Sequence, residues 1–547
     1  MGESAEFYTL LIEGQEKELK CSKQHTLLQS LTDGQIFLEA NCGGRGTCGK
    51  CKVQVLVGRV TAKNGLAISP GEDNTYQACQ VYPQGDVTVR LKQSKVSAKG
   101  QITEMFVDDD RSLLSKIVIT PEYPTVANHY SLQDMISRVL PASAADPGSC
   151  ADSSSIKDEK VLHQLATVLD ASPELLTVTL FNNEVIVVEA GNTADVLFGV
   201  AFDIGTTTVV GMLVDINQKK VVAIHSETNP QTAFGADVIS RIQAANELPD
   251  GLVAQSQAIR QCLNRIVKEL CAVSGVSPSN IYAATIAGNS TMSHLLLEIS
   301  PSALVRKPFA AVFKHITPFY SGKIELGIHP AGKVVILPNI ASFIGSDTTA
   351  AVLAVDQDIS AKPILMVDLG TNGEMVLGKG NTLYACSTAA GPAFEGAHIR
   401  DGMRATAGAI ADVTITDNVL VEVIGNSKPA GICGSGIVKA VAELVKAGII
   451  GPTGRFDQSA TKTLSANLGQ RLKKQENQWE YVLVEGKDSA NGADISVTQA
   501  DIRQIQLVKS SICTGIQFLL EQIRIEQEIQ VCLAGAFGNY IDIDSTL

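Results

Sequence analysis

Residues 41–52 read NCGGRGTCGKCK, and this stretch decides how the start of the chain folds. Cys42, Cys48 and Cys51 stand at C-x5-C-x2-C spacing, and Cys79 follows in TYQACQVYP. Four thiolates, three of them on one tight loop, are the ligand set of a [2Fe–2S] cluster. The glycines between the cysteines allow the loop to wrap closely and to direct backbone N–H groups at the sulfurs. The stretch therefore predicts a one-electron carrier.

Two other interpretations of these cysteines remain open at this point. A C-x2-C pair is common in zinc ribbons, although such sites usually combine two C-x2-C or C-x2-H units, whereas Cys79 stands alone. The other interpretation is four reduced thiols on a glycine-rich turn, but spacing of this kind is seldom accidental. The iron–sulfur interpretation is therefore favoured.

Length and charge limit the classes of protein to consider. The 547 residues exceed what one core holds, so two to four domains are expected. The net charge of −13 argues against a nucleic-acid partner and against an anionic membrane surface. Twelve cysteines in so long a chain are not a secreted disulfide framework, and neither a signal sequence nor an apolar run of 18 residues occurs. We expect a cytoplasmic protein.

The order of strand-like and helix-like segments divides the first 200 residues. Residues 1–93 predict a ferredoxin-like β-grasp domain, with a hairpin about Gly14, a helix in HTLLQSLTDGQ, the cysteine loop, and strands at 52–57, around Cys79 and at 87–91. A polar linker is expected at 94–116. Residues 117–199 predict a small α+β middle domain that ends in a hairpin turning at Asn182 and Asn183. Its second helix is expected to bury Leu162, Leu165, Ala166 and Leu169 on one face.

From residue 200 one pattern occurs twice. GVAFDIGTTTVVGMLVD places Asp203 and a Gly-Thr turn between two apolar strands, and PILMVDLGTNGEMVLG repeats this around Asp368, 165 residues later. Helical stretches at 238–246, 252–273 and 293–299 make the region α/β. Repetition at this distance indicates two duplicated lobes, the first from 200 and the second from about 362, rather than a solenoid.

The two turns predict phosphate binding. A Gly-Thr turn between strands gathers backbone N–H groups and hydroxyls around one point, which is how phosphate is held. An aspartate at the end of the preceding strand can hold Mg²⁺, usually through water. A third element, VCLAGAFGNY at 531–540, runs from an apolar strand into a glycine-rich turn against which a flat base can lie. Each element alone is often a plain turn, so it is their occurrence together, in this order, that indicates a nucleotide site.

The three elements resemble the ATP site of the actin, sugar-kinase and Hsp70 (ASKHA) superfamily, whose lobes have an RNase H-type fold. A ferredoxin-type domain fused to such a core resembles the reductive activators of corrinoid proteins, which are ATP-dependent enzymes that restore cobalt to Co(I) in methyl-transfer systems. The resemblance covers nearly the whole chain and includes IAGNSTMSHLLL (286–297), LPNIASFIGSDTTAAVLA (337–354), STAAGPAFEGAHI (387–399) and AGICGSGIVKAV (430–441). It implies an actin-like core, often in a homodimer, with a [2Fe–2S] cluster, ATP and Mg²⁺ as cofactors. A corrinoid protein and an external low-potential electron donor are the implied partners.

The resemblance also implies roles for single residues. Asp203 and Asp368 would lie at the metal. Phosphate contacts would fall on the two turns, at Gly205, Thr206, Thr207, Gly370, Thr371 and Asn372. Adenosine would lie against Gly535, Ala536 and Gly538, and the cleft would be lined by Gly391, Pro392, Glu395, Gly434, Ser435 and Gly436. Asn289 and Ser290 form another tight turn that either contacts phosphate or caps a helix from about Thr291, and capping is the favoured alternative.

The end of the chain departs from this pattern. The resemblance implies further helices and strands after the adenosine turn, whereas the sequence ends at IDIDSTL, nine residues after Gly538. A truncated product or a fragment is therefore expected.

The use of ATP follows from the redox potentials that the resemblance implies. A plant-type [2Fe–2S] centre has a reduction potential of about −400 mV. The reduction potential of the Co(II)/Co(I) couple is expected to be lower. ATP would change the conformation of the core and so alter its affinity for the Co(II) form relative to the Co(I) form of the corrinoid protein. Tighter binding of the Co(I) form would then favour the reduced state. One alternative is an activator of another low-potential enzyme, such as a 2-hydroxyacyl-CoA dehydratase, although those activators hold a [4Fe–4S] cluster between subunits and have no ferredoxin domain. The other is a non-catalytic, ferredoxin-linked ATP-sensing module.

Overall fold

The computed structural model describes most of the chain. The described residues are 7–13, 18–34, 36, 38, 51–62, 66–91, 112–139, 156, 158–370, 372–396, 398–459, 464–475, 478–525 and 527–535. The chain divides into two compact units, residues 1–93 with 98–338, and residues 339–547 with 94–97. None of the helices in the described ranges combines the length and apolar character needed to cross a membrane.

Over its described residues, the first domain contains a five-stranded sheet, the two-stranded sheet β4-β6 and the helix α1. The strands of the five-stranded sheet are ordered β2-β1-β7-β3-β5, with β1 and β7 parallel. Leu27 and Leu31 of α1 are fully buried in the core beneath the sheet. The predicted strands at 52–57 and 87–91 are confirmed. The elements are β1 (Phe7–Ile12), β2 (Glu18–Ser22), α1 (Leu27–Asp33), β3 (Lys52–Val57), β4 (Val60–Thr61), β5 (Thr75–Gln77), β6 (Tyr82–Pro83) and β7 (Val87–Leu91).

The expected strand around Cys79 is wrong. The strand β5 ends at Gln77, and Cys79 lies in the turn that follows it. Ala78 continues the pairing with the chain before β3 by donating its backbone N–H to the Cys51 carbonyl at 2.7 Å. The pairing ends there because Gln80 donates its N–H back to the Gln77 carbonyl at 2.9 Å, which closes a turn.

The middle domain is a three-stranded sheet, ordered β10-β9-β8, with two helices. Its elements are β8 (Leu114–Ile119), α2 (Leu132–Val139), α3 (Glu159–Leu169), β9 (Leu176–Phe181) and β10 (Glu184–Ala190). The hairpin is confirmed, since Asn182 and Asn183 adopt φ of 48° and 63° between β9 and β10. Two expectations differ from the structure. The strand β8 begins inside the expected linker. The helix α3 buries Val161, Leu165 and Leu169, whereas Leu162, which is 41% exposed, and Ala166 are exposed, because the buried face repeats every four residues.

The middle domain is packed against the lobe that follows it. Lys116 in β8 is buried, and its ammonium lies 2.7 Å from the Glu189 carboxylate and 2.9 Å from the Tyr282 hydroxyl of β14. Apolar side chains of β8, β9 and β10 share a core with Tyr282 and Ala331. The two parts therefore form one packed body.

The first lobe contains a six-stranded sheet, ordered β13-β12-β11-β14-β16-β15. The long helix α5 covers one face and buries Ile259, Leu263 and Ile266 against β12 and β13. The elements are β11 (Phe198–Ile204), β12 (Thr208–Asp215), β13 (Lys220–Thr228), α4 (Val238–Glu247), α5 (Gly251–Ser274), β14 (Ile281–Gly288), α6 (Ser290–Leu296), β15 (Phe319–Tyr320) and β16 (Lys333–Ile336).

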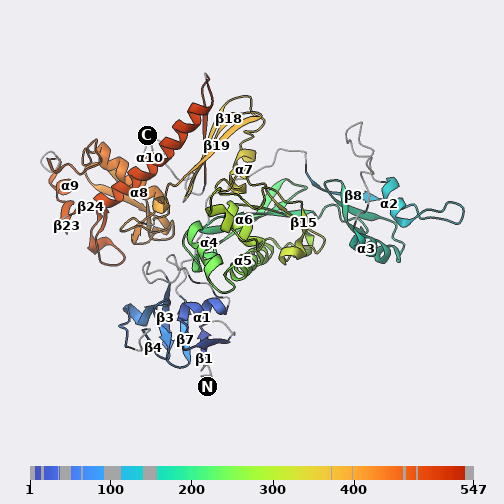
Figure 1. Ribbon diagram of the computed structural model, residues 1–547, viewed down its shortest axis with the longest axis horizontal. Coiled ribbons are helices and arrows are strands. Elements are labelled where there is room, and N and C mark those ends of the chain that lie inside the picture. Colours follow the sequence, from blue (N-terminus) through green and yellow to red (C-terminus); the bar gives the residue numbers. More distant parts are fainter. Residues whose placement is uncertain are drawn as a thin grey trace. The chain divides into compact units, whose positions relative to one another are not determined.

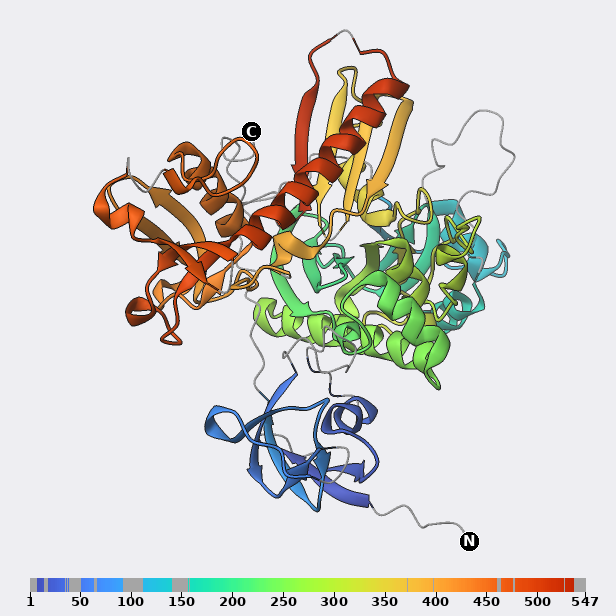
Figure 2. The same cartoon turned by 60° about the vertical axis from the view of Figure 1, so that its left-hand side comes forward.

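The second unit contains a four-stranded sheet, ordered β19-β18-β17-β26. Leu365, Val367 and Met375 face the helix α10, whereas Met366 and Val376 face the helix α7 on the other side. Figures 1 and 2 show α10 in red across the yellow strands, with β26 in red at their edge. The elements are α7 (Ser346–Ala354), β17 (Ile364–Leu369), β18 (Gly373–Lys379), β19 (Thr382–Thr388), α10 (Gln499–Gln522) and β26 (Gln530–Ala534). Because α7 packs against β17 and β18, this unit begins before residue 362.

Two smaller sheets complete the second unit and share one core with the helix α8. They are ordered β21-β20-β22 and β23-β24-β25. Their elements are β20 (Ala409–Ile415), β21 (Val419–Val423), β22 (Gly431–Ile432), α8 (Gly434–Lys446), α9 (Ala466–Gly469), β23 (Leu472–Gln475), β24 (Gln478–Val484) and β25 (Ile495–Thr498).

The two larger sheets have the same topology. In each, three antiparallel strands are joined by short turns, and a fourth strand from much later in the chain adds in parallel beside the first. The predicted repeat is thus visible in strand order, with β11–β13 and β14 matching β17–β19 and β26.

Candidate nucleotide and iron–sulfur sites

The first turn, residues 205–207, joins β11 to β12. Asp203 is the last residue but one of β11, and its side chain is exposed. Gly205 donates its N–H to the Thr208 carbonyl at 3.0 Å, and a Cβ at Gly205 would lie 2.7 Å from that same oxygen. Only glycine therefore fits this position, and the turn is as tight as its sequence predicts.

Two asparagines hold the first turn in place. The Asn229 side-chain amide donates to the Gly205 carbonyl at 2.8 Å, and the Asn229 backbone N–H donates to the Thr207 carbonyl at 2.8 Å. Asn289 caps α6 by accepting from the Met292 N–H at 3.1 Å, and it also donates its Nδ2 to the Thr206 hydroxyl at 3.1 Å. The predicted cap is confirmed, and the same side chain fixes a predicted phosphate-binding residue.

The second turn, residues 370–372, joins β17 to β18. Gly370 donates its N–H to the Asn372 carbonyl at 3.1 Å, and Thr371 lies outside the described residues. Asp368 in β17 is directly opposite Glu374 in β18, which is opposite Ser387 in β19. Side chains opposite one another share a face of the sheet, so Asp368 and Glu374 lie on the face that α7 covers.

The surroundings of the second turn are acidic. Asp347 lies in the first turn of α7 and is half-buried, and this burial raises the pKa of its carboxyl. Burial and the charge of Asp347 raise the pKa of Asp368 to about 6. Burial and the charges of both aspartates raise the pKa of Glu374 to about 8, against the opposing hydrogen bond from Ser387. Three carboxylates so placed favour a bound proton or a cation.

Each of the two turns lies beside an aspartate suited to Mg²⁺. Asp203 and Asp368 offer carboxylate oxygens, the ligands that Mg²⁺ prefers. Within the described ranges, no three His, Cys, Asp or Glu side chains form a ready metal-binding group. This fits Mg²⁺, which usually takes one or two carboxylates and completes its shell with water and phosphate oxygens.

The third element is represented by Gly535 at the end of β26. Ala534 is opposite Asp368, and Gly535 adopts φ of 87°. A Cβ at Gly535 would lie 2.5 Å from the Asp368 carboxylate. The predicted adenosine residue therefore lies directly beside the predicted metal ligand, while Ala536 and Gly538 fall outside the described residues.

Two of the four predicted cluster ligands are described. Cys51 and Cys79 are both buried, and the 2.7 Å hydrogen bond between Ala78 and Cys51 holds their segments side by side. The Gln80 side chain donates to Cys79 Sγ at 3.8 Å. Soft thiol donors with N–H···S contacts fit an iron–sulfur cluster. Cys42 and Cys48 lie outside the described residues.

Comparison with known proteins agrees with these observations. Three family models match: a 2Fe-2S iron-sulfur cluster binding domain at residues 10–84, the RACo middle region at 198–360, and the C-terminal domain of RACo, the ASKHA domain, at 362–547. The corrinoid activation enzyme RamQ of Eubacterium limosum is 34% identical over 542 residues, covering 96% of this chain and 86% of that protein. The chain belongs to the RACo family.

Two further known proteins are similar to this chain over different lengths. A solved structure of a reductive activator for a corrinoid, iron-sulfur protein is 32% identical and covers 98% of this chain and 90% of its own, with a TM-score of 0.68. A "[Co(II) methylated amine-specific corrinoid protein] reductase" of Methanosarcina barkeri is 26% identical over 290 residues, covering 46% of this chain and 52% of that protein. The predicted [2Fe–2S] domain and ASKHA-type core are thereby confirmed, and the match to the first domain favours iron–sulfur over zinc.

The predicted cleft residues have different surroundings in this structure. Gly391 follows β19 at the end of the sheet that carries the second turn, and with φ of 88° it has open space around its Cα. Gly434 and Ser435 begin α8, next to Gly436, where a Cβ would lie 2.1 Å from the Ile410 carbonyl. Gly436 is therefore explained by helix packing alone. The side chains of Pro392 and Glu395 lie outside the described residues.

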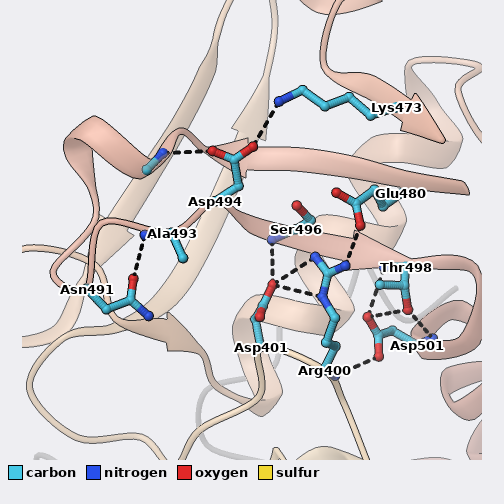
Figure 3. A network of polar contacts seen from close by, with 11 residues as sticks. Arg400, Asp401, Lys473, Glu480, Asn491, Ala493, Asp494, Ser496, Thr498 and Asp501 are labelled. Carbon is cyan, nitrogen blue, oxygen red and sulfur yellow. Dashed lines mark hydrogen bonds and ion pairs between the residues drawn. The ribbon is translucent and has the colours of Figure 1, made fainter. Parts of the chain in front are cut away.

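A polar network anchors the segment that follows Gly391 (Figure 3). Arg400 forms ion pairs with Asp401 and Glu480, and its backbone N–H donates to the buried Asp501 carboxylate at 2.9 Å. Asp501 also completes the capping box of α10 with Thr498. The segment is thus fixed to the start of the helix that supports β18 and β19.

Sequence reasoning missed several residues around the two turns. Asn229, Arg241, Asp347 and Glu374 were not singled out, and neither was the equivalence of Gly288 and Gly535. The signal for the glycines was available, since IAG and LAG each end a strand that pairs with a repeat aspartate. No local signal marks Asn229 or Arg241.

Proposed function

We propose that this chain is an ATP-dependent reductive activator that delivers one electron to the Co(II) form of a corrinoid protein and so regenerates Co(I). The observation that carries the proposal is the joining, in one chain, of buried cluster-type cysteines to two sheets that each present an Asp-Gly-Thr turn. The similarity to RamQ, over nearly the full chain, supports the same activity.

We assign the following roles to the predicted residues. Cys42, Cys48, Cys51 and Cys79 hold the cluster. Asp203 and Asp368 hold Mg²⁺, the residues of the two turns contact the phosphates, and Gly535, Ala536 and Gly538 accommodate adenosine. Gly391, Gly434 and Ser435 line the nucleotide cleft. The division into residues 1–93, 94–116, 117–199 and 200–547, with the middle domain now beginning at β8 (Leu114), is part of this proposal. An external low-potential donor, a cytoplasmic location and a homodimer belong to it as well.

ATP is needed because the midpoint potential of the [2Fe–2S] cluster lies above that of the Co(II)/Co(I) couple. When bound, the cluster supplies one electron at low potential, and each ~59 mV uphill costs tenfold in the equilibrium constant of a one-electron transfer. The protein can offset this only if it binds the Co(I) form of its partner better, relative to Co(II), in one conformation than in another. ATP bound by the two turns selects that conformation, and phosphoryl chemistry there depends on positioning and charge.

The test uses anaerobic, cluster-loaded full chain with a Co(II) corrinoid protein and a low-potential reductant. The visible spectrum is followed for Co(I) with and without Mg-ATP. We expect Co(I) only with Mg-ATP, and none with Cys79→Ser or Asp203→Ala. Cys513→Ser is the matched control, because Cys513 is an exposed cysteine on α10.

The outcomes separate the alternatives. Co(I) formed equally without Mg-ATP would contradict the proposal. Absence of Co(I) from a chain with an intact cluster and bound ATP would point to another acceptor, and absence of ATP binding would refute the nucleotide site.

A further inference from the structure

The segment 229–241, NPQTAFGADVISR, closes over the back of the first turn. All three carbonyls of the turn accept hydrogen bonds from this segment. Asn229 donates to Gly205 and Thr207, and the Arg241 guanidinium donates its Nη2 to the Thr206 carbonyl between them. The turn is therefore held from one side by a single continuous stretch of chain.

Holding the carbonyls also orients the amide groups of the turn. In a trans peptide the C=O and the following N–H point in opposite directions. When the Gly205 and Thr206 carbonyls point at Asn229 and Arg241, the N–H groups of Thr206 and Thr207 point away from them. This is the orientation in which successive backbone N–H groups form an anion-binding concavity.

Arg241 is an unusual residue for this place. It lies on α4 and is 0% exposed, one of the largest fully buried side chains described. Besides Thr206, the guanidinium donates Nε to the Gly235 carbonyl at 3.0 Å and Nη1 to Met292 Sδ at 3.4 Å. A buried charge is screened far less than an exposed one, so its field acts on an anion at the turn.

We propose that Arg241 is a positioning residue for the nucleotide phosphates: it fixes the amide groups of the first turn and adds a positive charge behind them. This rests on the proposed function, in which the first turn binds ATP. Arg241 acts through the turn and does not touch the nucleotide itself. It should therefore affect how tightly phosphate is bound more than how fast the bound nucleotide reacts.

The test is calorimetric titration of the full chain with Mg-ATP, which gives both Kd and the number of sites per chain. We expect Arg241→Met to raise Kd about tenfold or more, because both the forked set of guanidinium N–H donors and the positive charge are lost. Arg241→Lys keeps the positive charge but loses the forked set of guanidinium donors, so it should raise Kd by an intermediate factor. The matched control is Arg260→Met, since Arg260 also donates Nε to a backbone carbonyl of this lobe, that of Leu296, at the far end of α6.

The number of binding sites per chain distinguishes a variant with a positioning defect from a variant that is partly unfolded. A variant that only unfolds in part loses sites while the remaining ones keep the wild-type Kd, whereas a positioning defect raises Kd with the number of sites unchanged. Arg241→Lys serves if Arg241→Met does not fold. Wild-type Kd in both variants, or lost sites with unchanged Kd, would overturn the inference while leaving the proposed function intact. Absence of Mg-ATP binding by the wild-type chain would overturn both.

Discussion

The two Asp-Gly-Thr turns are similar in topology and opposite in their surroundings. The first is backed by amide donors and by the buried guanidinium of Arg241, and the partner opposite Asp203 is the apolar Val210. The second is flanked by carboxylates, and the partner opposite Asp368 is the buried Glu374. The same strand-turn-strand unit thus presents a donor-rich site in one lobe and an acid-rich site in the other.

The difference teaches that a repeated motif need not have a repeated task. Hydrogen-bond donors and a cation favour an anion, whereas neighbouring carboxyl groups that are half-buried or buried favour a bound proton or a cation. We infer that the first turn contributes mainly to phosphate affinity and the second mainly to Mg²⁺ affinity.

Removing the two aspartates should have the largest effect. We expect Asp203→Ala and Asp368→Ala each to lower ATP hydrolysis by about 10²-fold or more, as for other groups that stabilise charge in a transition state. Asp368→Ala should also raise the Mg²⁺ concentration for half-maximal rate more than Asp203→Ala does. Steady-state rates over a Mg²⁺ series check this, with the exposed Asp195→Ala as control. Equal Mg²⁺ requirements in both variants would contradict the assigned difference.

The two equivalent glycines give the next comparison. At Gly535 a Cβ would lie 2.5 Å from the Asp368 carboxylate, whereas at Gly288 it would lie 2.8 Å from the Ile204 carbonyl. Both Ala variants should lose about 1–3 kcal/mol of stability through overpacking. Only Gly535→Ala should also raise KM for ATP, by about tenfold. Thermal unfolding and ATPase kinetics test this, and Gly322→Ala, where a Cβ meets nothing within 4 Å, is the control.

The carboxylates of the second turn predict a pH dependence of stability without metal. Because the pKa of Glu374 is raised to about 8 from an ordinary 4.5, the folded state keeps a proton that the unfolded state loses. Its contribution is fully present below about pH 4.5 and is lost as pH rises towards 8, at no more than about 1.4 kcal/mol per pH unit. In EDTA, Glu374→Gln should flatten this decline, whereas the exposed Glu422→Gln should not. Denaturant unfolding from pH 5 to 8 measures it, and an unchanged slope in Glu374→Gln would refute the assignment.

The smallest effect is expected at Asn289, which has two functions in the first lobe. Asn289→Ala should cost about 1 kcal/mol because the N-cap of α6 is lost. Asn289→Asp keeps an acceptor for the Met292 N–H but loses the amide that donates to Thr206. Asn289→Asp should therefore retain stability and still weaken ATP binding. If both variants bound ATP as the wild type does, the contact with Thr206 would have no part in the site.

The sequence predicted those parts of the fold that depend on local pattern. The β-grasp strands, the repeated aspartates and the hairpin at Asn182 and Asn183 all have signatures within a few residues. The strand expected at Cys79 was wrong because the chain turns after Gln77, where Gln80 donates its N–H back to the Gln77 carbonyl. No glycine, proline, asparagine or aspartate in TYQACQ marks that turn in the sequence.

The surroundings of the two turns were not predictable in the same way. Arg241 reaches Thr206 only after α4 folds back on the sheet, and a lone arginine in a helix gives no warning of burial. Gly288 and Gly535 end equivalent strands, but α4 and α5 precede one, whereas two extra sheets and α8–α10 precede the other. Unequal insertions conceal this part of the repeat.

The central claim is that nucleotide binding changes how strongly the chain prefers the Co(I) form of its partner. The most direct measurement is the midpoint potential of the Co(II)/Co(I) couple of a corrinoid protein, titrated in complex with the full chain, with and without a non-hydrolysable Mg-ATP analogue. By thermodynamic linkage, each tenfold change in relative affinity shifts this potential by about 59 mV. We predict a higher potential with nucleotide than without it, and a smaller shift for Arg241→Met at the same nucleotide concentration. An identical potential with and without nucleotide, at saturating analogue, would contradict the account.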